Sequence, residues 1–147
     1  MTESVTRSCS SPGIDPPAVW VDAIVAVGRD LQCFRYGREV NPDQLVWELS
    51  VGSGNDVRIG WTGTAGISGF TFCGGTDAMV ADASFAEAAR SVADIAQTEL
   101  AGYDFIQWPS QGRHLLHARR VDGVAVWFDR HTDRVVASIG ALCNAVW

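Results

Sequence analysis

The stretch that decides the fold is Ser84-Phe-Ala-Glu-Ala-Ala-Arg-Ser-Val-Ala-Asp-Ile-Ala-Gln-Thr-Glu-Leu-Ala-Gly102. Ser84 and Glu87 form a capping box, in which the serine oxygen accepts from the Glu87 amide and the glutamate reaches back to the amide of the cap. Apolar residues then recur every three or four positions and share one face of a helix. Gly102 stands where the end of a helix favours a left-handed residue. The pattern predicts an amphipathic helix between these two ends.

The N-terminal region predicts another helix, over residues 16–31. Asp15 can cap it, and Pro16 suits its first turn, where the missing N–H is no loss. Apolar residues cover more than half of its surface, so we expect a helix that is buried on two sides. Residues 1–14 are rich in Ser, Thr, Pro and Gly and predict a disordered tail. A single domain is therefore expected over residues 15–147.

Alternating apolar and polar residues predict strands before and after the long helix. Before it, we expect a short edge strand within Cys33–Arg38 and then strands over residues 45–51, 57–61 and 67–73. After it, we expect strands over residues 104–108, 115–121, 124–128 and 135–139. Val121-Asp-Gly-Val124 predicts a hairpin, because a type I′ turn needs positive φ at both central residues. The result is an α+β fold: helix, three-stranded antiparallel meander, helix, then a three- to four-stranded antiparallel meander.

The composition excludes several classes of function. The chain has 147 residues and a formal net charge of −6, and all eleven of its basic residues are arginines. Without lysine there is no P-loop lysine, no Schiff base and no Ser–Lys nucleophile pair. A net negative charge disfavours nucleic-acid binding and would steer the protein towards a basic protein partner. No cofactor is indicated.

The apolar stretches and the cysteines bear on the compartment. No apolar run reaches the roughly 20 residues that a bilayer span requires, so no membrane is expected among the partners. The N-terminus lacks the pattern of a secretory signal, and we expect a cytoplasmic protein. The four cysteines are widely scattered, and a reducing cytosol would leave them as free thiols.

Two histidines and three arginines concentrate in the segment Arg113–Arg120. His114 and His117 would point to opposite faces of a strand, which argues against a shared metal ion unless His114 lies in the loop before it. No Cys-x-x-Cys motif accompanies them, and zinc needs three or four ligands. We therefore predict no metal site and interpret the segment as a solvated, cationic strand.

The hairpin register places two arginines on opposite faces of the sheet. With Asp122-Gly123 as a two-residue loop, Arg120 lies diagonal to Trp127, where a cation–π contact is expected. Arg119 instead shares an apolar face with His117. An arginine there needs a carboxylate or a ligand anion, and a structural ion pair is the more frequent outcome.

Tryptophan and cysteine supply the remaining candidates. Most of the six tryptophans should lie in the core, but Trp108 before Pro109 and the terminal Trp147 are expected to be exposed. Exposed tryptophan near arginine is typical of protein-binding hot spots. Cys73 ends a strand beside two glycines and is the candidate nucleophile, although a buried, inert cysteine is more common.

The C-terminal third resembles a module of small actinobacterial α+β proteins. The similarity rests on Phe105-Ile-Gln-Trp-Pro109, Val121-Asp-Gly-Val-Ala-Val-Trp127 and Val135-Val-Ala-Ser-Ile-Gly140. In those relatives Cys-Pro or additional histidines often follow the Trp-Pro pair, whereas Ser110–Arg113 stands here, so the resemblance implies no metal site. It also carries no activity that could be transferred to a residue of this chain.

Together these features predict a non-catalytic protein-binding module of the immunity, inhibitor or chaperone type. The acidic charge, the many aromatic residues and the lack of a catalytic constellation favour this interpretation. The alternative is a small enzyme or small-ligand binder that uses Cys73, or the face of His117 and Arg119, together with a carboxylate such as Asp77 or Asp104. The expected contact residues are Trp108, Arg113, His117, Arg119, Arg120 and Trp127.

Overall fold

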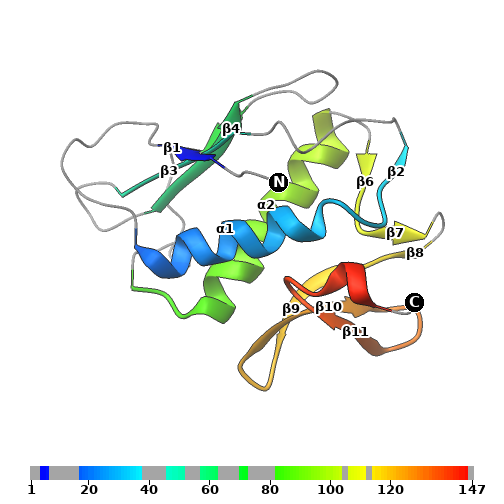
Figure 1. The fold of residues 1–147 in the computed structure, drawn as a ribbon. Helices are drawn as coiled ribbons and strands as arrows, with labels where there is room; N and C mark the ends of the chain where they lie inside the picture. Colours follow the sequence, from blue (N-terminus) through cyan, green and yellow to red (C-terminus); the bar gives the residue numbers. More distant parts are fainter. Residues whose placement is uncertain are drawn as a thin grey trace.

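Two helices pack against each other between two sheets (Figure 1). The structure is a computed structural model that describes residues 4–6, 17–37, 46–51, 57–62, 70–72, 82–103, 106–111 and 114–145. Helix α1 spans Ala18–Asp30, and helix α2 spans Phe85–Tyr103. The Oγ atom of Ser84 accepts the amide of Glu87 at 3.2 Å, which confirms the predicted cap of α2.

The helix ends differ in part from the prediction. α1 begins at Ala18, and the carbonyl of Pro17 accepts its first helical hydrogen bonds. Asp15, the expected cap, lies outside the described residues. α2 continues through Gly102 to Tyr103, so the predicted end at Gly102 is wrong. Glycine costs only about 1 kcal/mol inside a helix and does not end one by itself.

The buried faces of the helices follow the predicted stripes and share one core with both sheets. In α1 and the residue after it, the buried apolar side chains include Trp20, Ala23, Ile24, Val27 and Leu31. In α2 they include Ala88, Ala89, Val92, Ala96 and Leu100. Phe85, at the start of the α2 stripe, remains 42% exposed.

The sheet above the helices in Figure 1 has the strand order β1–β3–β4–β5. β3 (Val46–Val51) pairs antiparallel with β4 (Val57–Thr62), and β4 pairs antiparallel with β5 (Phe70–Phe72), as predicted. β1 (Ser4–Thr6) pairs parallel with β3, so the predicted disorder is wrong at this segment. The open edge of β3 supplies the hydrogen-bond partners that an isolated tail would lack.

The second sheet has the strand order β11–β10–β9 and lies on the opposite side of the helices (Figure 1). It consists of β9 (His117–Val121), β10 (Val124–Asp129) and β11 (Arg134–Ser138), all antiparallel. Asp122 and Gly123 have φ values of 51° and 79°, which confirms the predicted hairpin turn. α2 packs against β9 and β10 and covers one face of this sheet.

Two short strand pairs join the helices to this sheet. β2 (Tyr36–Gly37) pairs with β6 (Ile106–Gln107), and β7 (Ser110–Gln111) pairs with β8 (His114–Leu115). The segment after α2 thus pairs with the segment after α1, and a short 3-10 helix, η2 (Leu142–Asn144), follows β11. The α+β class is confirmed. No helix of the described residues is long and apolar enough to cross a membrane.

Candidate functional site

The two tryptophans expected at a contact surface are buried. Trp108 is 1% exposed and Trp127 is 0% exposed, and their ring centroids lie 5.0 Å apart at 78°. The Nε1 atom of Trp108 donates to the carbonyls of Asp30 and Cys33, each at 3.0 Å. The predicted exposure of Trp108 is wrong because internal acceptors satisfy the polar end of its ring. Trp147 lies outside the described residues.

Asp30, the last residue of α1, has a buried carboxylate that accepts three hydrogen bonds. Oδ2 accepts from Trp127 Nε1 at 2.8 Å and from the Gly140 amide at 2.6 Å, and Oδ1 accepts from the Leu142 amide at 3.0 Å. Burial raises the pKa of Asp30 above its ordinary value, and these hydrogen bonds lower it in part. A carboxylate whose donors all come from the protein is a structural centre rather than a ligand site.

A disulfide joins Cys33 to Cys143 across 110 residues of sequence, with 5.5 Å between the Cα atoms. The predicted free thiols are therefore wrong for this pair. Residues 139–145, which we call the C-terminal hook, bring Cys143 beside the end of α1, where the hook also donates to Asp30. Spacing in the sequence cannot show such a pair, because only the tertiary fold brings its two Cα atoms within bonding range.

Arg119 and Arg120 point to opposite faces of the second sheet, as the hairpin register predicts. Arg120 Nη1 contacts Glu87 Oε1 of α2 at 2.9 Å, so the predicted contact with the Trp127 ring is replaced by an ion pair. The guanidinium carbon of Arg119 lies 4.1 Å from the centroid of the Phe128 ring. The expected ion pair is thus made by Arg120, and a cation–π contact is made by Arg119.

The side of the second sheet that faces away from α2 carries exposed apolar residues. Val124 and Val135 are each 48% exposed, and Arg119 is exposed beside the buried Phe128. Antiparallel sheets that meet solvent on one face normally place polar side chains there. We call this side the outer face. The register assigns to it His117, Arg119, Val121, Val124, Val126, Phe128 and Val135, of which Val126 and Phe128 are buried.

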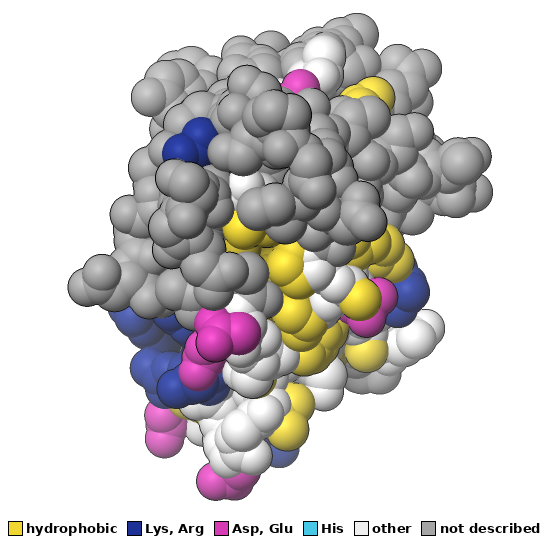
Figure 2. Space-filling view, turned by 90° about the vertical axis from the view of Figure 1, so that its left-hand side faces the viewer, with side chains coloured by type: hydrophobic (Ala, Val, Ile, Leu, Met, Phe, Trp, Pro, Cys, Tyr) yellow, Lys and Arg dark blue, Asp and Glu magenta, His cyan; other side chains and the backbone are white. Residues whose placement is uncertain are grey.

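Figure 2 shows the side of the molecule on which α1 and α2 begin. Apolar side chains form a band across its middle, with arginine and carboxylate side chains beside them. No histidine of the described part of the chain is visible in this view.

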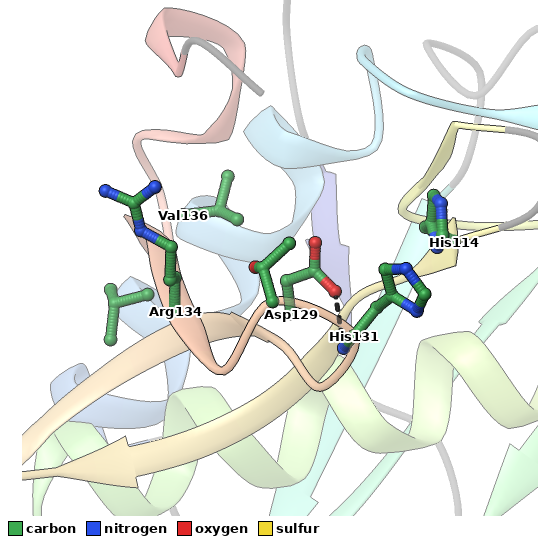
Figure 3. Close-up of a pocket in the computed structure, with 7 residues that line it drawn as sticks. His114, Asp129, His131, Arg134 and Val136 are labelled. Carbon is green, nitrogen blue, oxygen red and sulfur yellow. Dashed lines mark hydrogen bonds between the residues drawn. The ribbon is translucent and has the colours of Figure 1, made fainter.

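All three histidines of the chain line two adjoining cavities beside the turn between β10 and β11. The first cavity has a volume of about 380 Å³, with Arg134 and Val136 on one side and the histidines on the other (Figure 3). The second cavity has a volume of about 330 Å³, and His117 and Arg130 are among the residues that line it. Three residues line both cavities and lie between them: His114, Asp129 and His131.

A hydrogen bond within the turn positions one of these histidines. Asp129 is 3% exposed, and its Oδ1 accepts the backbone amide of His131 at 2.8 Å. The His131 ring then lies 4.3 Å from the ring of His114, measured between centroids, at 39°. The sequence prediction missed both Asp129 and His131. The signal that could have found them was an aspartate two residues before the histidine in a turn, which is typical of an Asx turn.

His117 and Arg119 lie on the same face of β9, but of the two only His117 lines one of these two cavities. His117 lines the second cavity, whereas Arg119 lies on the Phe128 ring of the outer face. Burial lowers the pKa of His117 below its ordinary value, and the positive charges of Arg130 and Arg119 lower it further. The neutral imidazole is therefore favoured at this position.

Four of the predicted groups fall outside the part of the chain that the structure describes. They are Cys73, Arg113 and the carboxylates of Asp77 and Asp104. Among the described residues, no three His, Cys, Asp or Glu side chains are grouped to hold a metal ion.

Comparisons with family models, with curated proteins and with solved structures found no match for this chain. The function is therefore inferred from the surfaces and cavities of this chain.

Proposed function

We propose that the protein is a non-catalytic protein-binding module, of the immunity, inhibitor or chaperone type, that contacts its partner through the outer face. The observation that carries this proposal is the exposure of Val124 and Val135 around the Arg119–Phe128 stack. Arginine is enriched in binding hot spots, and exposed apolar side chains that are grouped on one face mark interaction sites. The outer face offers these groups on a rigid sheet.

The charge of the contact surface favours an acidic partner. Residues 114–147 contain four arginines and three aspartates, a formal charge of +1, and the sheet carries most of them. Arg119, Arg130 and Arg134 are exposed around the sheet together with Asp122 and Asp133, while Asp129 is buried. A partner is steered by the potential of the surface that it meets. The net charge of the chain, which favours a basic partner, is therefore a poorer guide than the charge of this sheet.

The test is a pull-down from an extract of the native host, followed by titration of the purified partner. Val124→Asp with Val135→Asp places two negative charges on the outer face and should weaken a stoichiometric complex by about a hundredfold. Raising the salt concentration should weaken the wild-type complex, because exposed charges are screened.

Phe85→Asp is the matched control, because Phe85 is also an exposed apolar residue but lies at the start of α2. This variant should bind like the wild type. The proposal fails if the double variant keeps its affinity, if both variants lose it equally, or if the wild type forms no stoichiometric complex. Circular dichroism of each variant checks that the fold is retained.

The alternative is a small enzyme or a small-ligand binder. The two histidine-lined cavities support the ligand binder. A pocket with a few convergent polar groups is the default position for a small ligand.

Cytoplasmic location stays a prediction, and the Cys33–Cys143 disulfide weighs against it because such bonds are rare in a reducing cytosol.

A further inference from the structure

The first cavity is lined by both hydrogen-bond donors and apolar side chains. His114 and His131 present imidazole groups, and Thr132 and Arg134 add a hydroxyl and a guanidinium. Val135 lines the same cavity, as does Val136, which is labelled in Figure 3. Its volume of about 380 Å³ lies in the range of small-molecule sites.

The polar groups of this cavity suit an oxyanion. Arginine binds carboxylates and phosphates through parallel N–H donors, and imidazole and hydroxyl groups donate to the same oxygens. Asp129 is the carboxylate in the lining, and its Oδ1 already accepts the His131 amide. The side chain that could repel an anion is thus partly satisfied within the protein.

A metal ion suits the same groups less well. Arg134 lines the first cavity and Arg130 lines the second, and both are cations at any physiological pH. In the described part of the chain no group of three ligands is arranged for a metal. A cation would therefore meet repulsion and an incomplete ligand set.

We infer that this cavity binds a small organic anion, with its carboxylate or phosphate group held by Thr132 and Arg134 and its apolar body against Val135 and Val136, facing the rings of His114 and His131 on the other side. The ligand class is an oxyanion on a short apolar group, because the cavity is too small for a large cofactor and combines polar donors with apolar side chains. The site shares Val135 with the outer face, but its binding groups Thr132 and Arg134 are not among the outer-face residues, so the inference does not depend on protein binding there.

Nuclear magnetic resonance of the histidine rings tests this inference, since the chain has only three histidines to assign. Phenyl phosphate should shift the His114 and His131 signals to saturation, with a dissociation constant of about 1 mM, as expected for so small a ligand. Inorganic phosphate should bind about tenfold more weakly because it lacks the apolar body. Benzyl alcohol, which lacks the anion, should cause no saturable shift.

Arg134→Gln and Thr132→Val should each weaken phenyl phosphate binding by about tenfold. Arg90→Gln is the control, because Arg90 is paired with Asp94 on α2 and lies outside the cavity. Equal weakening by the control, or shifts that never saturate, would overturn the inference. So would zinc ions that saturate the histidine signals at stoichiometric concentration while phenyl phosphate does not. Both variants change exposed residues, and their amide spectra verify the fold.

Discussion

Asp30 receives hydrogen bonds from β10 and from the C-terminal hook at the end of α1, where the helix dipole already disfavours a negative charge. Its side chain nevertheless lies in the core. The three donors explain this position, because each of them would otherwise be a buried N–H group without an acceptor. At the scale of residues, Asp30 joins distant parts of the chain, with a separation of 97 residues to Trp127.

Asp30→Asn should lower the free energy of unfolding by about 1–3 kcal/mol, measured by urea denaturation at neutral pH. The amide has one acceptor oxygen, so in either orientation at least one of the three donors faces an NH2 group. Asp94→Asn, on the exposed side of α2, is the control and should change stability by less than about 0.5 kcal/mol. Equal effects of the two changes would show that the buried hydrogen bonds contribute nothing.

The difference in stability between the wild type and Asp30→Asn should depend on pH, in a direction set by the pKa of Asp30. The pKa of Asp30 is raised from 3.8, so the folded protein binds this proton more tightly than the unfolded chain does. The stabilisation from the proton is complete below 3.8 and is lost as the pH rises through the raised value. The stability of the wild type relative to Asp30→Asn should therefore fall across that window, in denaturation curves recorded from acidic to neutral pH.

Arg130→Gln should raise the pKa of His117, measured by titration of its ring signals. Burial is the first cause of the lowered value, and the charge of Arg130 is the second. Arg134→Gln is the control, because Arg134 is not among the charges that act on His117. Since the pKa is lowered from 6.5, the stabilisation linked to the neutral ring is present above that pH and is lost on acidification. An unchanged His117 titration in Arg130→Gln would contradict the electrostatic assignment.

At the scale of elements, two glycines with positive φ allow the stability cost of backbone strain to be compared with the added cost of steric crowding. Gly123, in the β9–β10 turn, has φ +79° and open space where a Cβ would lie. Gly140, in the hook, has φ +106°, and a Cβ added there would lie 3.2 Å from the Cβ of Ala26. Gly123→Ala should cost about 1 kcal/mol of unfolding free energy, from backbone strain alone. Gly140→Ala should cost about 3 kcal/mol, because overpacking is added. Equal losses in thermal unfolding would refute the close contact between hook and α1.

The disulfide fastens the same hook to the residues after α1. Replacing Cys33 and Cys143 together by serine should lower the free energy of unfolding by about 2–4 kcal/mol, because the unfolded chain regains the freedom of a long loop. Urea denaturation of the wild type and the variant, each under oxidising conditions, measures the difference. Mass spectrometry after thiol labelling verifies the bond, and a wild type that labels at Cys33 without reductant would disprove the pairing.

At the scale of the whole molecule, the hook completes the core. A chain that ends at Ser138 loses the buried side chains of Ile139 and Leu142 and two of the donors to Asp30. The combined loss is about 5 kcal/mol or more, which approaches the total stability of an ordinary domain. We expect no cooperative unfolding transition in near-ultraviolet circular dichroism. A chain that ends at Ala145 is the control, and a cooperative transition in the shorter chain would contradict this role of the hook.

Short-range signals in the sequence predicted most of the elements. The Ser84 cap, the α1 and α2 stripes and the Asp122-Gly123 turn each depend on neighbours a few residues apart, and the structure confirms them. The candidate site was predicted less well. Trp108 and Trp127 were assigned to a surface, although their indole N–H groups find acceptors at Asp30, with separations of 78 and 97 residues.

The sequence by itself determined the α+β class, the hairpin register and the exclusion of lysine chemistry, because these depend on composition and on local backbone preferences. Only the tertiary structure decided that Asp30 is buried, that Cys33 meets Cys143 and that His114 lies beside His131. Each of these is a contact between distant segments. Its energy depends on burial and on the partner that the fold supplies, and neither is written in the residues next to it along the chain.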